Sequence, residues 1–228
     1  HSRRKFFEDI LNPMLENTNY DYSKNFTDIY FLEFNMSNIC NLKCRMCDGI
    51  NSSAWVKDDL KLAKNGNPYF RRVADPEFGY TNKSQEIIQR LFEDPEPFMN
   101  LRYLSIKCGE PYMEPANKII LQKFIDLGIA KNVTLDWTTN GTIVDDEIQE
   151  LARQYGETKW TVSLEGTGGL YEYIRGGKNF TFDQLNDNIK QYDVDRIIIA
   201  VTIMAYNIAH LDKIYWWFED NKQDNCRI

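Results

Sequence analysis

The sequence predicts an α/β protein whose parallel sheet is curled into an open, partial barrel. Short β-rich runs alternate with helical patterns along the 228 residues, and most of these runs alternate apolar and polar side chains. A third observation is a loop with three cysteines that directly follows the first run. Strands that alternate with helices indicate βαβ crossovers, which pair strands in parallel, and ligands bind at the carboxyl ends of such strands.

The predicted strands cover 28–36, 101–107, 132–139, 159–165 and 196–204, and the predicted helices lie near 52–64, 83–93, 116–128, 144–154, 181–191 and 208–220. In the segment 143–156, apolar residues recur at helical spacing and Gly156 stands at the C-cap position. We expect 1–27 to form an N-terminal helical extension, and 28–228 to form the barrel core with a helical insertion at about 50–98. The chain ends at "NCRI", where a sixth strand would begin, so we expect the last strand to be missing or to lie beyond residue 228.

Four of the five predicted strands alternate, whereas parallel strands buried on both faces read as continuous apolar runs. In the third run, Leu135 and Trp137 share one face and Asp136 and Thr138 the other. The apolar face meets the helices, and the polar face must point at water or a polar ligand, or its groups must satisfy one another, because burying them unpaired costs roughly 1–3 kcal/mol each. The pattern predicts a polar cavity inside the barrel, where Lys107 is a candidate to bind an anionic group.

The composition is that of a globular domain, with 43% apolar and 27% charged residues and a net charge of −7. Acidic and basic residues are interspersed, and no basic block indicates a nucleic-acid partner. The longest apolar run, "IIIAVTIMA", is too short to span a bilayer, so we expect no membrane partner. The start "HSRRKFFED" does not resemble a signal peptide, and five cysteines then favour metal or catalytic use in a cytoplasmic location.

The stretch "NICNLKCRMCDG" places Cys40, Cys44 and Cys47 within eight residues at the end of the first predicted strand. Thiolates are soft ligands that suit iron–sulfur clusters, zinc or Cu(I), so these three residues are the candidate metal ligands and the centre of the candidate catalytic site. A structural zinc site would close with four protein ligands. The candidates for that fourth ligand are Cys108, Cys226 and His210.

The run "CNLKCRMC" resembles the CxxxCxxC signature of the radical S-adenosylmethionine (SAM) enzymes, most closely of members with a SPASM or twitch extension. The resemblance implies a partial (β/α)6-type barrel with a 4Fe-4S cluster on the three cysteines and SAM on the fourth iron. It also implies an electron donor such as flavodoxin or ferredoxin, and cleavage of SAM to a 5′-deoxyadenosyl radical that abstracts hydrogen from a substrate.

The resemblance leaves the substrate open, with a peptide or protein first and a small heterocycle or nucleotide precursor as the alternative. Two interpretations outside the radical SAM class also stay open. One is a zinc-binding structural or interaction module without SAM activity, and the other is an iron–sulfur electron carrier or scaffold.

Further motifs follow the later strands in the order that the family shows. "KCGEPYM" resembles the GGEP motif, in which the backbone and Glu110 would receive the SAM amino group. Cys108 replaces the first glycine of that motif, and we expect this replacement to be tolerated if Cys108 has φ below zero. "WTTNG" ends the third strand, and "VSLEGTGGLYEYIRGG" resembles the fourth-strand pattern. By that resemblance Ser163 and Arg175 would hold the SAM carboxylate, and Glu165 its ribose.

"AVTIMAYN" resembles the fifth-strand segment that packs against adenine, with Met204 and Asn207 as the contacts, and Met46 would lie beside the same base. A surface ion pair for Arg175 and plain core packing for Met204 remain alternatives. The cofactor-binding residues that the resemblance implies are Met46, Cys108, Gly109, Glu110, Pro111, Thr139, Asn140, Ser163, Glu165, Arg175, Met204 and Asn207.

Overall fold

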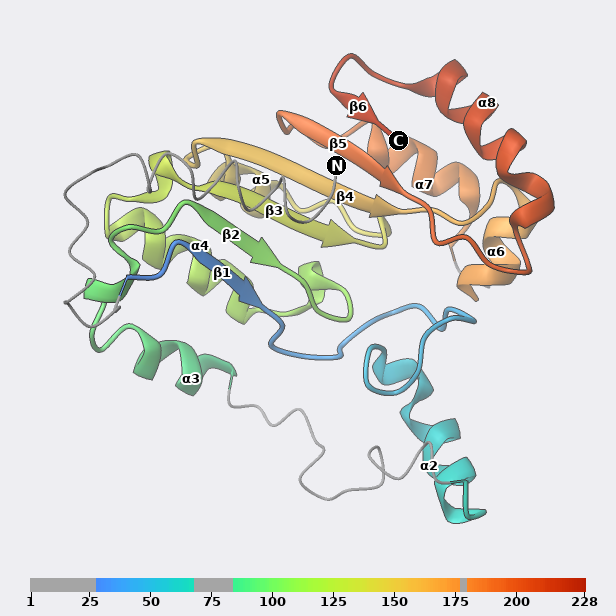
Figure 1. Cartoon of the computed structure of the whole chain (residues 1–228), viewed down its shortest axis with the longest axis horizontal. Coiled ribbons are helices and arrows are strands. Elements are labelled where there is room, and N and C mark those ends of the chain that lie inside the picture. Colours follow the sequence, from blue (N-terminus) through green and yellow to red (C-terminus); the bar gives the residue numbers. More distant parts are fainter. Residues whose placement is uncertain (1–27, 68–83, 177–179) are drawn as a thin grey trace.

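The computed structural model describes residues 28–67, 84–176 and 180–228, so the expected extension 1–27 lies outside the described residues. Its sheet has six strands in the order β1-β2-β3-β4-β5-β6, and each strand pairs in parallel with the next (Figure 1). The strands are β1 (Phe31–Phe34), β2 (Tyr103–Ile106), β3 (Thr134–Thr139), β4 (Glu157–Ser163), β5 (Arg196–Ala200) and β6 (Cys226–Arg227). The predicted open parallel α/β sheet is confirmed.

The expectation of a missing last strand was wrong, because Cys226 pairs with Ile197 and begins a two-residue β6 inside the chain. The helices are α2 (Val56–Lys64), α3 (Ser84–Leu91), α4 (Ala116–Asp126), α5 (Asp146–Ala152), α6 (Gly169–Arg175), α7 (Phe182–Ile189) and α8 (Leu211–Asn221). The 3-10 turns are η1 (Ser53–Trp55), η3 (Glu96–Phe98), η4 (Pro111–Met113), η5 (Ala130–Asn132) and η6 (Ile208–His210). Within the described ranges, none of the helices combines the length and apolar character needed to cross a bilayer.

Local sequence explains where several helices begin. The Asp145 side chain caps α5 by accepting from the backbone N–H of Ile148 at 3.0 Å. Thr181 and Gln184 form a capping box at the start of α7, where each side chain accepts from the backbone N–H of the other. Such caps satisfy backbone donors that have no partner inside the helix.

One row of apolar side chains crosses the sheet and forms the centre of the core. Register pairs Ile106 with Trp137, Trp137 with Trp160, and Trp160 with Ile197, and these side chains are all buried. The two indole rings stack at 5.7 Å between centroids. Side chains from α4, α5, α7 and α8 belong to the same cluster, so this is the helix-covered face. The predicted apolar side of the strands is therefore confirmed.

The opposite face of the strands carries polar side chains that pair with one another. Lys107 Nζ lies 2.8 Å from Glu33 Oε2, and Ser105 Oγ donates to Asp136 Oδ2 at 3.2 Å. Lys159 Nζ lies 3.7 Å from the other Asp136 oxygen. Ser105 and Lys107 thus have partners on this face, as the alternative of mutual satisfaction predicts, whereas Asp136 Oδ1 is buried without a hydrogen bond among the described residues. Lys107 is paired with a carboxylate in place of the anionic group suggested by the sequence.

Candidate metal and cofactor site

The backbone of the cysteine loop is held by donors from the segment that follows it. The indole Nε1 of Trp55 donates to the carbonyl of Cys44 at 2.8 Å, and Ser52 Oγ donates to the carbonyl of Leu42 at 2.6 Å. A loop without regular structure needs such partners for its carbonyls. Sequence reasoning missed both donors, although polar side chains within a few residues of an irregular loop are the signal that points to them.

The three thiols lie at different depths. Cys44 is buried, and Cys40 and Cys47 are half-buried. The pKa of Cys44 is lowered to about 7, first by a hydrogen bond with the Cys47 thiol and also by the positive charge of Arg175. The same contact between the two thiols raises the pKa of Cys47. Burial raises the pKa of Cys40. The loop therefore presents free, soft sulfur ligands, and Cys44 lies in the environment that most favours a thiolate.

Arg175 and Glu165 form a buried ion pair directly behind Cys44. Arg175 Nε and Nη2 donate to the two Glu165 oxygens at 2.5 and 2.9 Å, and both side chains are more than nine-tenths buried. The third nitrogen, Nη1, lies 3.6 Å from Cys44 Sγ. The alternative for Arg175 was a surface ion pair. The ion pair exists, but it is buried, and Arg175 contacts the candidate ligand Cys44.

The C-terminal end of α6 packs against the cysteine loop. The backbone N–H of Arg45 donates to the carbonyl of Ile174 at 2.8 Å. Gly176 has φ +72°, and a Cβ there would lie 2.5 Å from the carbonyl oxygen of Lys43. Only glycine fits this approach without displacing the loop. The glycine therefore lets α6 bring Arg175 within reach of Cys44.

The turn after β2 packs against the backbone that precedes the cysteines. A Cβ on Gly109 would collide with the carbonyl oxygen of Ile39, so glycine allows this contact between two chain segments. Cys108 has φ below zero, as expected, because no described residue other than glycine has a positive φ. Its thiol lies 3.9 Å from Asn117 Nδ2, which also donates to the carbonyl of Pro111 at 2.9 Å.

Glu110 joins the turn after β2 to the turn after β3. One carboxylate oxygen accepts from the backbone N–H of Asn140 at 2.7 Å, and the other accepts from Thr139 Oγ1 at 2.8 Å and from the N–H of Tyr112 at 3.4 Å. The side chain is 0% exposed, and burial raises its pKa to about 7. In this structure Glu110 is a link between turns, and contact with a cofactor amine stays a prediction.

The raised pKa of Glu110 predicts a pH-dependent stability. The carboxyl titrates near 4.5 when unfolded and near 7 when folded, so the native state holds the proton more tightly. Its contribution is fully present below pH 4.5 and is lost as pH rises through 7. At about 1.4 kcal/mol per pKa unit the whole shift amounts to roughly 3 kcal/mol, of which about 2 kcal/mol is lost between pH 5 and pH 7, and we expect this loss to be absent in Glu110→Gln.

Denaturant titrations at pH 5 and pH 7 measure this effect, because they give the free energy of unfolding of each variant at both values. Glu150→Gln, which alters an exposed carboxyl group on α5, is the matched control and should keep the pH dependence of the wild type. An unchanged pH dependence in Glu110→Gln would show that another group carries it.

The loop after β5 is fastened to the end of β4 by Asn207. Its Nδ2 donates to the carbonyls of Glu165 at 3.1 Å and Thr202 at 2.8 Å, and its Oδ1 accepts from the N–H of Met204 at 2.8 Å. Both carbonyl contacts of the Asn207 amide group are thus to the protein backbone. Recognition of the adenine base by Asn207 stays a prediction. Met204 is half-buried.

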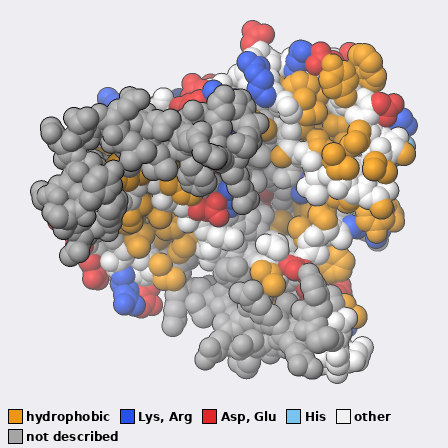
Figure 2. Space-filling model, viewed as in Figure 1, with side chains coloured by type: hydrophobic (Ala, Val, Ile, Leu, Met, Phe, Trp, Pro, Cys, Tyr) orange, Lys and Arg blue, Asp and Glu red, His pale blue; other side chains and the backbone are white. Residues whose placement is uncertain are grey.

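The remaining predicted contacts lie on two different elements. Ser163 is half-buried at the last position of β4, opposite Ala200 in the register, and Met46 is 37% exposed on the cysteine loop. Tyr173 and Tyr206 are also exposed, and their rings meet edge to face at 5.8 Å. Figure 2 shows many hydrophobic side chains over the part of the molecule that holds α6 and α8.

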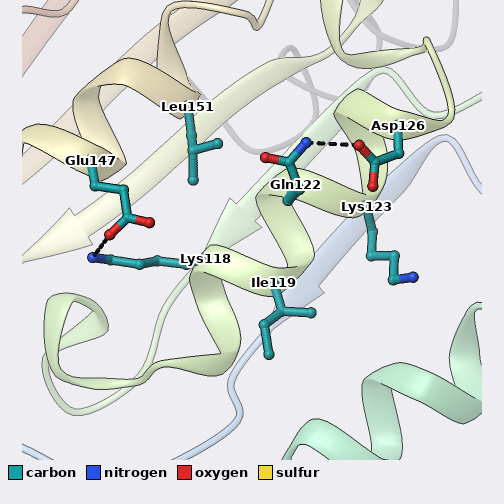
Figure 3. A pocket seen from close by; sticks show the side chains of 7 residues that line it. All are labelled: Lys118, Ile119, Gln122, Lys123, Asp126, Glu147 and Leu151. Atoms are coloured by element: carbon teal, nitrogen blue, oxygen red, sulfur yellow. Dashed lines mark hydrogen bonds and ion pairs between the residues drawn. The ribbon is translucent and has the colours of Figure 1, made fainter.

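A separate groove lies outside this site, between α4 and α5 (Figure 3). Within it, Lys118 Nζ lies 2.5 Å from Glu147 Oε2, and the Gln122 amide donates to Asp126 Oδ1 at 2.7 Å. None of the cofactor-binding residues predicted from the sequence lines it. The groove therefore has no part in the candidate site.

The zinc alternative finds no support in the placement of Cys226, which is buried in the helix-side core on β6. Across 28–67, 84–176 and 180–228, no three His, Cys, Asp or Glu side chains lie close enough to hold a single ion. The donor set of three soft thiols on one loop suits an iron–sulfur cluster by its chemistry.

Comparison with known proteins identifies the fold. No family model and no curated protein matches the sequence. The solved structures that match include a histidine-tagged anSMEcpe with bound AdoMet, at 18% identity and a TM-score of 0.54 over 87% of this chain and 50% of that chain. Another is Streptococcus suis SuiB bound to precursor peptide SuiA, at 16% identity and a TM-score of 0.52 over 97% of this chain and 50% of that chain. Both are radical SAM enzymes. The chain has their fold and spans about half the length of each.

Proposed function

We propose that this chain, whose fold is that of the radical SAM enzymes, is itself a radical SAM enzyme. The observation that carries the proposal is the loop of Cys40, Cys44 and Cys47, which lies at the carboxyl end of β1 in that fold. The neighbour with bound AdoMet supports the same cofactor here. The location in the fold and the donor chemistry thus support one another, as the carboxyl ends of parallel strands are the usual place for ligands.

The three cysteines would hold a 4Fe-4S cluster and leave one iron for SAM. When bound, the reduced cluster would supply one electron to the sulfonium of SAM, so that the sulfur–C5′ bond is broken to methionine and a 5′-deoxyadenosyl group that takes a hydrogen atom from substrate. The protein's part is to place the sulfurs and exclude competing reactions. A cytoplasmic donor such as flavodoxin or ferredoxin would supply the electron.

The other predicted residues would act around that centre. Glu110 and Asn140 keep two strand-end turns together beside the cysteines, and Arg175 with Glu165 supports Cys44 from behind. Three predicted cofactor contacts make no such side-chain link among the described residues: Met46, Ser163 and Met204. They are therefore the first positions to test for direct contact with SAM.

A peptide or protein is the substrate that we propose. Its support is the neighbour SuiB, which is bound to a precursor peptide. The exposed side chains Tyr173, Ile203, Tyr206 and Ile208 also fit an extended partner better than a small polar one, because exposed apolar patches mark interaction sites. No contact among the described residues favours the small heterocycle.

Anaerobic reconstitution followed by electron paramagnetic resonance tests the function. We expect a reduced cluster whose signal changes when SAM is added, with 5′-deoxyadenosine among the products. A cluster whose spectrum ignores SAM would favour an electron carrier. Zinc without acid-labile sulfide would favour the structural module.

A further inference from the structure

Asn140 occupies a fixed position between the turn after β3 and the cysteine loop. Its backbone N–H donates to Glu110 at 2.7 Å, and its side-chain Oδ1 accepts from the N–H of Thr142 at 2.9 Å. The residue is 6% exposed. With the backbone and the carbonyl end of the amide both held, the direction of the Nδ2 group is determined by the turn.

That Nδ2 group points at the first cysteine. It lies 3.6 Å from Cys40 Sγ and donates to Asn41 Oδ1 at 2.9 Å. Asn41 in turn donates through its own Nδ2 to Thr142 Oγ1 at 2.8 Å. The cysteine loop and the turn after β3 are therefore joined in both directions, and the amide of Asn140 is the part of this link that reaches sulfur.

We infer that Asn140 is a positioning residue whose N–H···S contact with Cys40 raises the reduction potential of the cluster that the loop holds. The inference rests on the proposed function and goes beyond it. A donor directed at a ligating sulfur stabilises negative charge there, and the reduced cluster carries one more electron than the oxidised cluster. The donor consequently favours the reduced form.

Other donors to the sulfurs set the scale of the expected effect. The backbone N–H of Leu42 also reaches Cys40 Sγ, at 3.4 Å, and Arg175 reaches Cys44. The Arg175 charge is offset by Glu165, so the pair adds a local donor and no net charge. Removing Asn140 Nδ2 would thus weaken one of several contacts and leave the cluster bound.

Two variants isolate the N–H···S contact. Asn140→Ser keeps a short side-chain acceptor for the turn but has no amide donor, and Asn140→Asp keeps the acceptor and adds negative charge. At a fixed ambient potential, we expect the ratio of reduced to oxidised cluster to fall about tenfold in Asn140→Ser, or about 59 mV for one electron. The fall should be larger in Asn140→Asp.

The matched control is Asn41→Ala, which breaks the link between the two segments and leaves the contact of Asn140 with sulfur in place. The measurement is a redox titration of the reconstituted wild type and variants without SAM, followed by the cluster's paramagnetic signal. Thermal unfolding of each variant shows that the turn has kept its fold.

The possible results separate the two proposals. A midpoint in Asn140→Ser equal to that of the wild type overturns the inference and leaves the proposed function standing. An equal shift in Asn41→Ala also overturns it, because the link between segments and not the sulfur contact would then set the potential. A wild-type protein that takes up no cluster overturns both.

Discussion

Replacing Cys44 with alanine is expected to abolish both cluster binding and SAM cleavage. Cys44 is the buried member of the three thiols, and its carbonyl is held by Trp55 while its sulfur faces Arg175. Loss of an outer partner of a metal ligand typically costs about 10–100-fold, so loss of a ligand itself should reduce 5′-deoxyadenosine formation by more than about 100-fold. Iron and sulfide analysis of the reconstituted variant measures the loss directly.

The chain offers a matched control in Cys226→Ala. This cysteine is also buried, but it lies on β6 in the helix-side core, so its removal should leave iron and sulfide at wild-type levels. A Cys44→Ala protein that still binds the cluster would move the site away from the loop. Loss of the cluster in both variants would point to a general folding defect.

The sequence predicted those parts of the site that depend on order along the chain. The cysteines, the turn at Gly109 and the turn at Asn140 all follow strands, and a parallel sheet brings the carboxyl ends of its strands to one edge. The alternation of Trp137 and Trp160 with polar neighbours likewise predicted which face meets the helices. Periodicity and strand ends are local signals, so they are readable without coordinates.

The elements that the sequence did not predict depend on contacts between distant residues. The strand β6 has two residues and exists through pairing with β5, and no run that short carries a periodic signal. The helix α6 follows Gly168 and was missed, since glycines predict a loop there. Its position, however, is what brings Arg175 to Cys44 across 131 positions of sequence.

Side-chain partners were the least predictable feature of the site. The resemblance assigned Glu110, Arg175 and Asn207 to cofactor contacts. In the structure the polar atoms of each form hydrogen bonds with other protein groups. The residue types suit both roles, because a carboxylate or an amide binds a ligand and a backbone group by the same chemistry. Spacing alone does not distinguish a ligand contact from a link between strand-end turns.

Arg175→Met is expected to destabilise the protein by about 3–5 kcal/mol, because it leaves the Glu165 carboxylate buried without its partner. Glu165→Gln should also destabilise it, and the double variant should cost less than the sum of the two changes, since it leaves neither charge uncompensated. Denaturant unfolding of the three variants under one set of conditions gives the coupling energy.

The exposed pair of Arg153 and Asp193 provides the comparison, with N–O contact at 2.7 Å and both side chains more than half exposed. Arg153→Met should cost no more than about 1 kcal/mol, because water already screens that pair. Equal losses in Arg153→Met and Arg175→Met would mean that burial adds nothing to the interior pair. A large loss confined to Arg175→Met would show that the buried ion pair behind Cys44 stabilises the fold, whatever the loop binds.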